Sequence, residues 1–208
     1  MIRVAIKGKN FGATPILGRI EFEIAKGETV ALVGPSGIGK STLLRLVAGI
    51  DTGFDGSVER PDALAMVFQE PTLLPWRTAL DNLRIVHPDL SDTAAFAAME
   101  KVGLSGKEQE FPGQLSLGQQ RRLSLARAFV GKPDLLIMDE PFVSLDPDTA
   151  ETMMRLTETL ISGQKPATLF VTHAMSEAQR LAQRVLSLRA SAEGAILETQ
   201  STYRHQDA

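Results

Sequence analysis

The segment of residues 34–41 constrains the fold of this chain more than any other. It matches the pattern G-x-x-x-x-G-K-[ST] and reads Gly34-Pro35-Ser36-Gly37-Ile38-Gly39-Lys40-Ser41. The apolar run Val30–Val33 before it is typical of a strand buried on both faces, and helical spacing follows it as far as Gly49. Such a loop turns backbone N–H groups toward a phosphate at the positive end of a helix. We therefore expect Lys40 to reach phosphate oxygens and the Ser41 hydroxyl to bind Mg²⁺.

Short apolar runs alternate with helical patterns along the rest of the chain. Strands are predicted at Ile20–Ile24, Ala63–Phe68, Leu135–Met138, Leu169–Val171, Val185–Leu188 and Ala195–Leu197, the last two as a hairpin around Gly194. Helices are predicted after the caps Ser91 (with Phe96, Met99, Val102), Ser116 (with Leu123, Ala126, Val130) and Asp146-Pro147 (with Met153, Leu156, Leu160), and through Met175, Ala178 and Leu181. Strands that alternate with helices predict an α/β fold with a mainly parallel sheet.

The strand pattern is missing from Pro71 to about Val130. This stretch is predicted to form a helical insertion on the sheet. The length of 208 residues suits one domain. We expect it to comprise a core of residues 1–70 and 131–208 and a helical subdomain of approximately 71–130.

Composition and charge exclude several classes of protein. The formal net charge of −3 argues against a surface that coats nucleic acid. The chain has no cysteine, which excludes a disulfide framework, a zinc finger and a thiol nucleophile. The longest apolar runs, Ala63–Phe68 and Ala94–Met99, are far shorter than the ~20 residues that cross a bilayer, and residues 1–7 lack a signal-peptide pattern. We expect a cytoplasmic protein with no nucleic-acid partner.

Two adjacent carboxylates follow the apolar run Leu135–Met138. Asp139 and Glu140 lie at the carboxyl end of a predicted buried strand, the edge at which open α/β sheets bind ligands. Neighbouring strand residues point in different directions, so the two carboxylates have separate tasks. Asp139 is expected to help hold Mg²⁺, usually through water, and Glu140 to polarise an attacking water.

The pentapeptide Leu115-Ser116-Leu117-Gly118-Gln119 resembles LSGGQ, the signature of the ATP-binding-cassette (ABC) ATPases. Gln69, Ser144-Leu145-Asp146 and His173 stand where that family has its Q-loop, D-loop and switch histidine. The resemblance covers roughly Ile2 to Leu197. It implies the P-loop fold of these ATPases, in which a mainly parallel sheet core carries an antiparallel β subdomain and a helical insertion.

The resemblance also assigns site residues for ATP and Mg²⁺. It implies that residues Gly34 to Thr42 hold the phosphates, including the Thr42 that follows Ser41, and that Gln69 joins the Mg²⁺ shell. Glu140 and His173 act on the attacking water. Phe11 stands where the family has an aromatic residue that stacks on adenine, usually a tyrosine; the alternative for Phe11 is a place in the core.

A single signature segment implies a second subunit. In the family, the segment corresponding to Ser116, Gly118 and Gln119 meets the γ-phosphate held by the other subunit, and the resemblance also counts Asp146 of the D-loop among the ATP-binding residues. We therefore expect a head-to-tail dimer, with a homodimer as the simplest form. Leu117 replaces the first glycine of the signature pair, a change that leaves the backbone contacts of Ser116 and Gly118 available.

The segment after Gln69 suggests what the ATP cycle moves. Leu73, Leu74 and Trp76 are large apolar residues in a predicted loop, which is typical of an interface. The alternative is that they pack within the helical insertion. The surrounding sequence looks like importers of the nitrate, sulfonate and taurine group. This implies membrane permease subunits as partners, a solute-binding protein acting indirectly, and a place on the cytoplasmic face of the membrane.

Three other functions compete with a transport ATPase. One is a cassette protein that acts on nucleic acid or ribosomes; that class usually carries two cassettes or long coiled coils, which this sequence lacks. A small-molecule kinase with the same loop would leave Leu115–Gln119 unexplained. A regulatory subunit without turnover conflicts with the presence of both Glu140 and His173.

Overall fold

The computed structural model describes residues 1–202, which form two compact units. The first unit contains Met1–Met66, Asp134–Glu140 and the chain from Lys165 onward. The second contains Val67–Pro133 and Pro141–Gln164. The predicted division had placed residues 141–164 in the core, but the helix in this segment packs on a helix of the second unit.

The first unit begins with an antiparallel sheet. Its strands are β1 (Ile2–Phe11), β2 (Thr14–Leu17), β3 (Ile20–Ile24) and β5 (Asp55–Glu59), with β1 paired to each of the other three. Only β3 was predicted from its own pattern, although the antiparallel sheet as a whole was expected from the resemblance. Alternate residues of β1 are buried, because one face of the sheet packs on the core of the unit.

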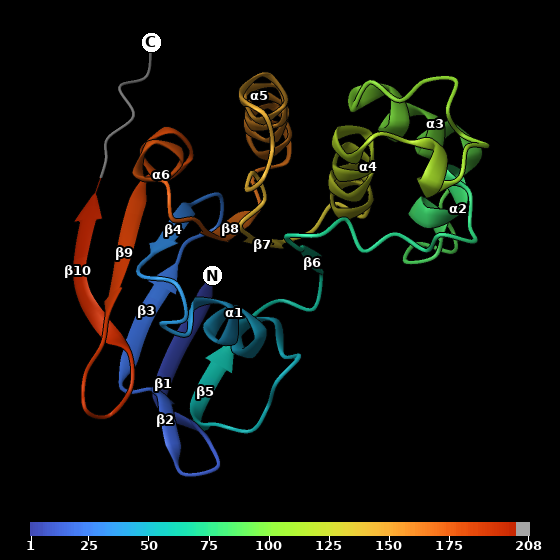
Figure 1. Ribbon diagram of the computed structural model, residues 1–208. Coiled ribbons are helices and arrows are strands. Elements are labelled where there is room, and N and C mark those ends of the chain that lie inside the picture. The colour runs from blue at the N-terminus through green and yellow to red at the C-terminus, as the bar shows by residue number, and fades with distance from the viewer. Residues whose placement is uncertain (203–208) are drawn as a thin grey trace. The chain divides into compact units, whose positions relative to one another are not determined.

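A six-stranded sheet forms the rest of this unit's core (Figure 1). In spatial order its strands are β10 (Ile196–Thr202), β9 (Arg184–Arg189), β4 (Thr29–Val33), β8 (Ala167–Val171), β7 (Leu135–Asp139) and β6 (Leu64–Val67). The central strands β4, β7, β8 and β9 are parallel, as predicted, and β4 and β8 are buried throughout. The predicted strand at Ala63–Phe68 exists as β6, but it is half-buried because it lies at the sheet edge.

The predicted hairpin around Gly194 is confirmed. Strands β9 and β10 pair in an antiparallel register, and Gly194 has a φ of 101° in the turn between them. A Cβ atom there would lie 2.8 Å from backbone atoms of Ile16 and Leu17. Both the left-handed conformation and the close approach therefore require glycine at this position.

Two helices of the first unit lie against the parallel strands. Helix α1 (Lys40–Ala48) contacts β7 and β8, and helix α6 (Met175–Leu181) contacts β4. Both were predicted, and α1 ends as expected at Gly49, which has a φ of 72° and donates to carbonyl groups of the last turn. Met175, predicted on the apolar face of α6, is exposed because it lies in the first turn next to the loop that follows β8.

The second unit is helical, as predicted for most of its length. Its helices are α2 (Ala79–Arg84), α3 (Asp92–Lys101), the short 3₁₀ segment η1 (Pro112–Gln114), α4 (Leu117–Val130) and α5 (Pro147–Gln164). Helix α4 contacts α2, α3 and α5. Ser91 and Ser116 cap α3 and α4 with their hydroxyl oxygens, as expected, whereas α2 was not predicted.

Two apolar residues of this unit, Phe96 and Leu73, depart from the predicted pattern, whereas Trp76 agrees with it. Ala95 and Met99, one turn apart, form the buried face of α3, so Phe96 between them points outward and is exposed. In the segment after β6, Leu73 packs against the core of this unit, in agreement with the alternative interpretation, but Trp76 is 68% exposed. The exposed indole is available for contact with another molecule.

A partly buried ion pair in the first unit predicts a pH-dependent stability. The ammonium of Lys9 donates to Asp51, and this hydrogen bond holds the pKa of Asp51 below its ordinary value. The carboxylate therefore contributes stability that is present above about pH 4 and is lost as the pH falls through its folded-state pKa. We predict that Asp51→Asn lowers the free energy of unfolding by roughly 1 kcal/mol near neutral pH, and that the difference from wild type shrinks below about pH 4.

Urea unfolding at a series of pH values measures this difference. Asp55→Asn is the matched control, because Asp55 is largely exposed and lies 4.0 Å from the Lys7 ammonium. A gap between Asp51→Asn and wild type that stays constant over the acidic range would contradict the assignment.

Candidate functional site

The loop between β4 and α1 has the geometry of an anion site. Its glycines Gly37 and Gly39 have φ angles of 75° and 108°, which side-chain-bearing residues rarely adopt. Gly39 takes the N-cap position of α1, where no side chain accepts from the first turn. The N–H groups of this turn are therefore left for a ligand at the positive end of the helix.

Lys40 lies folded over the same loop. Its ammonium donates to the carbonyl oxygens of Gly34 (2.9 Å) and Pro35 (3.0 Å), and the residue is buried. These two bonds hold the charge close to the N–H groups of the loop. The lysine thus places a positive charge beside the loop; that it reaches phosphate oxygens stays a prediction.

Ser41 and Asp139 meet at the same edge of the sheet. The Ser41 hydroxyl donates to Asp139 Oδ1 over 3.2 Å. Burial raises the pKa of Asp139, and the hydrogen bond from Ser41 opposes that rise. A hydroxyl and a partly desolvated carboxylate are oxygen donors that suit Mg²⁺, so the residues fit the ion. In residues 1–202, no group of three or more His, Cys, Asp or Glu side chains is placed to hold a metal ion.

Glu140 and His173 form a second pair beside the first. Glu140 Oε2 lies 3.8 Å from His173 Nδ1, and Glu140 has a φ of 47°. The N–H of Glu140 donates to the carbonyl oxygen of Val171 at the end of β8. The positive φ ends the strand conformation at Glu140, and this bond helps to hold the backbone there.

Thr172 fixes the turn that carries His173, a role that the sequence analysis missed. Its buried hydroxyl accepts from the N–H of Ala174 and donates to the Glu177 carboxylate. Ala174, the N-cap residue of α6, has no side-chain oxygen, so Thr172 takes over part of the capping. A threonine two residues before the N-cap of a helix that has an acid in its first turn is the signal that could have revealed this contact.

In the second unit, the signature segment opens helix α4. Ser116 Oγ accepts from the Gln119 N–H, while Gln119 Oε1 accepts from the Ser116 N–H over 2.9 Å, which makes a capping box. Gly118 lies in the first turn, where a Cβ atom would be 3.0 Å from Thr149 Cγ2. Leu117 is about half exposed, so its side chain does not disturb the cap.

Asp146 lies beside this helix start. A hollow of about 450 Å³ is lined by residues of both segments, among them Ser116, Gly118, Ser144 and Asp146. Hydrogen bonds with Thr149 hold the pKa of Asp146 below its ordinary value, so the carboxylate stays charged at the start of α5. Arg121 of α4, which the sequence analysis did not single out, links this helix to the segment before Asp146 by donating to the Pro141 and Val143 carbonyl oxygens.

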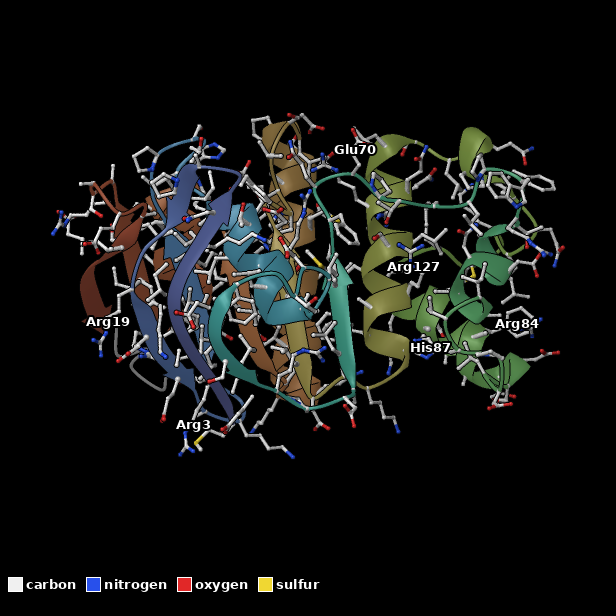
Figure 2. The ribbon with its side chains drawn as sticks, turned by 90° about the horizontal axis from the view of Figure 1, so that it is seen from below. Arg3, Arg19, Glu70, Arg84, His87 and Arg127 are labelled. Carbon is white, nitrogen blue, oxygen red and sulfur yellow. The ribbon has the colours of Figure 1, made fainter. Side chains whose placement is uncertain are left out.

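Gln69 also lies in the second unit, exposed just after β6. The residues that follow it are tied to α4 by Arg127 (Figure 2), which donates to the Pro71 carbonyl and to both oxygens of Thr72. Thr72 has a φ of 48°, an uncommon conformation that these bonds help to maintain. The proposed link between Gln69 and Mg²⁺ stays a prediction.

Phe11 ends β1 and is 55% exposed, so the alternative that placed it in the core is wrong. The Lys9 ammonium lies over its ring, 4.7 Å from the centroid. An exposed aromatic ring near a phosphate loop is available to stack on a base.

No helix within residues 1–202 is long and apolar enough to cross a membrane.

Comparison with curated proteins finds related sequences over most of the chain. It is 46% identical to the aliphatic sulfonates import ATP-binding protein SsuB 2 of Mesorhizobium japonicum over 192 residues, which are 90% of this chain and 77% of that protein. It is equally identical to the SsuB protein of a Mycobacterium species over 193 residues, 89% of this chain and 79% of that protein.

A solved structure is also similar to this chain over nearly its whole length. The dimeric structure of the ATP-binding cassette MJ0796 in a post-hydrolysis state, bound to ADP and Pi, superposes with a TM-score of 0.82 at 27% identity. The match covers 99% of this chain and all of that one. A family model described as ABC transporter matches residues 17–143, more than half of the sequence. The predicted fold class is confirmed, and the chain belongs to the ABC transporter family.

Proposed function

We propose that this ABC ATPase energises the import of a small organic sulfonate or a similar anion. One observation supports ATP hydrolysis by this chain: the phosphate loop, the Ser41–Asp139 pair and the Glu140–His173 pair lie at the ends of adjacent parallel strands. The sulfonate class is suggested by relatives of 46% identity whose names state sulfonate import. In such a system the cassette supplies the energy, and other subunits select the solute.

Each side chain has a defined task in this proposal. Residues 34–42 bind the triphosphate, with Lys40 neutralising charge on the β- and γ-phosphates. Ser41, Asp139 and Gln69 would hold Mg²⁺, which would supply electrostatic stabilisation of the charge that develops on the phosphates. Glu140 accepts a proton from the attacking water, and His173 orients that water and contacts the γ-phosphate. Phe11 stacks on the adenine.

A second copy of the chain completes the site. Ser116, Gly118 and Gln119 lie at the start of α4 with Asp146 nearby, and they form an anion-binding helix end. In the head-to-tail dimer this end meets the γ-phosphate bound by the partner subunit. The dimeric state of the MJ0796 cassette supports this arrangement.

Membrane permease subunits are the proposed partners of the dimer. The exposed Trp76 and the half-buried Leu74 follow Gln69 and give this segment an apolar surface. The chain would then work at the cytoplasmic face of the membrane, with a solute-binding protein acting through the permease.

Lys40→Ala tests the phosphate site. Removing the ammonium leaves the charge on the β- and γ-phosphates without its partner, so tight binding of Mg-ATP should be lost. Equilibrium binding of ATP to the purified chain gives the answer. An unchanged affinity would falsify the assignment of residues 34–42.

Glu140→Gln tests hydrolysis and assembly together. The substitution removes the basic carboxylate and keeps the shape, so ATP should still bind while turnover stops and a dimer accumulates. Light scattering with Mg-ATP reports the dimer, and phosphate release reports turnover. A variant that remains monomeric at high protein concentration, or that hydrolyses ATP at the wild-type rate, would contradict the sandwich model.

Trp76→Ala tests the docking surface. Since the indole is exposed, its loss should leave the melting temperature and ATP binding nearly unchanged while permease binding weakens by ~2 kcal/mol or more, roughly thirtyfold. Copurification with the permease measures the association. A large fall in melting temperature, corresponding to the ~3–5 kcal/mol of unfolding free energy that a buried aromatic residue typically contributes, would instead mean that Trp76 belongs to the core.

A further inference from the structure

A buried lysine lies at the end of β1, outside the phosphate loop. Lys9 is 5% exposed, and its ammonium lies 2.7 Å from Asp51 Oδ2 and 2.8 Å from the Gly53 carbonyl oxygen. Asp51 is held in turn by the Gly53 N–H, over 2.9 Å. A lysine is almost never buried unless it is paired, and here the pairing fixes the ammonium in one place.

The same ammonium also lies over an aromatic ring. Three oxygens surround Lys9 Nζ within hydrogen-bond distance: Asp51 Oδ1 (2.9 Å), Asp51 Oδ2 (2.7 Å) and the Gly53 carbonyl oxygen (2.8 Å). The ring of Phe11, two residues along the strand, lies with its centroid 4.7 Å from Lys9 Nζ, within the range of a cation–π contact. Phe11 remains 55% exposed in spite of this contact. The ring is therefore held by the lysine on one side and is open to a ligand.

The same contacts connect the ring to the phosphate loop. Asp51 and Gly53 follow the end of α1, the helix that the phosphate loop opens. On the other side, Phe11 pairs with Thr14 at the start of β2, and a Cβ atom at Gly39 of the loop would lie 2.8 Å from the side chain of Leu17 at the end of that strand. The ring thus lies on the β1–β2 strand pair, which borders the phosphate loop, and Lys9 links it to the residues that follow α1.

We propose that Lys9 is a positioning residue for base recognition: held by Asp51 and Gly53, it fixes the Phe11 ring in the orientation that stacks on adenine. This inference rests on the proposed function, in which Phe11 contacts the base of ATP. Lys9 itself touches neither base nor phosphate in this role. Its effect must therefore depend on the ring and on a ligand that has a base.

Ligands with and without a base separate this role from a general one. We would measure the affinity of the full chain for a non-hydrolysable ATP analogue and for tripolyphosphate, both with Mg²⁺. Lys9→Met removes the charge and keeps the length of the side chain. We expect the ATP analogue to bind about three- to tenfold more weakly, as for loss of a cation–π contact that orders the ring, and tripolyphosphate to bind as in wild type.

The ring itself provides the decisive comparison. In a Phe11→Ala background, Lys9→Met should cause no further loss of affinity for the ATP analogue, because the lysine has no ring to position. Lys9→Arg should restore much of the affinity, since a guanidinium also stacks on aromatic rings. Equal weakening of both ligands, the same loss with and without the ring, or no loss at all would overturn the proposal.

Two further variants guard against unrelated effects. Arg3→Met is the matched control, because Arg3 is on the same strand (Figure 2) and pairs with Glu23 on the exposed surface; its ligand affinities should be unchanged. Lys9→Met combined with Asp51→Asn keeps the net charge and avoids an unpaired carboxylate. This double variant should bind the ATP analogue more weakly and tripolyphosphate as in wild type. If Lys9→Met alone folds poorly, the double variant tests the positioning role in its place.

Failure of the proposed function has a different signature. A wild-type chain that binds neither the ATP analogue nor tripolyphosphate, or a Lys40→Ala variant that binds both as well as wild type, would contradict the phosphate site itself. Normal binding of both ligands with no effect of Lys9 would contradict only the positioning role.

Discussion

The pairing of β8 with both β4 and β7 is the constraint on which the candidate site depends. Because the three strands are parallel, their carboxyl ends lie at one edge of the sheet. The phosphate loop follows β4. Asp139 is the last residue of β7 and Glu140 follows it, and His173 comes after β8. No single segment contains the site, and the sheet register brings its parts together.

Local strain is concentrated in the segments that surround this chemistry. Within residues 1–202, five residues other than glycine have a positive φ, and three of them are Thr72, Glu140 and Ser144. Each lies in a segment with a proposed role in ATP binding, hydrolysis or assembly. Hydrogen bonds from Arg127 to Thr72 and from the Glu140 N–H to Val171 support two of these conformations.

Much of this arrangement was predictable from the sequence. The glycine-rich loop, the buried strand β4 and the serine caps of α3 and α4 depend on local patterns, and each formed as expected. Strand β1 was missed even though Ile2, Val4 and Ile6 alternate with less buried residues, so its pattern was present and unused. Strand β5, with sequence Asp-Gly-Ser-Val-Glu, has no apolar alternation and forms because it pairs with β1.

The side-chain contacts that organise the site were beyond sequence patterns. Lys9 and Asp51 are 42 positions apart, and Arg127 and Thr72 are 55 apart, so only the folded chain brings them together. The half-burial of Leu73, which the sequence analysis had favoured as an exposed loop residue, likewise depends on how helices pack within the second unit. Periodicity gives the elements, whereas such contacts depend on tertiary packing.

The central claim is that the edge formed by β4, β8 and β7 binds the triphosphate of Mg-ATP. A crystal structure of the chain with Mg²⁺ and a non-hydrolysable ATP analogue tests it most directly. The account predicts the β- and γ-phosphates against the N–H groups of residues 34–41, with the ion next to Ser41 and Asp139. Nucleotide bound at another place on the chain, with this loop empty, would contradict it.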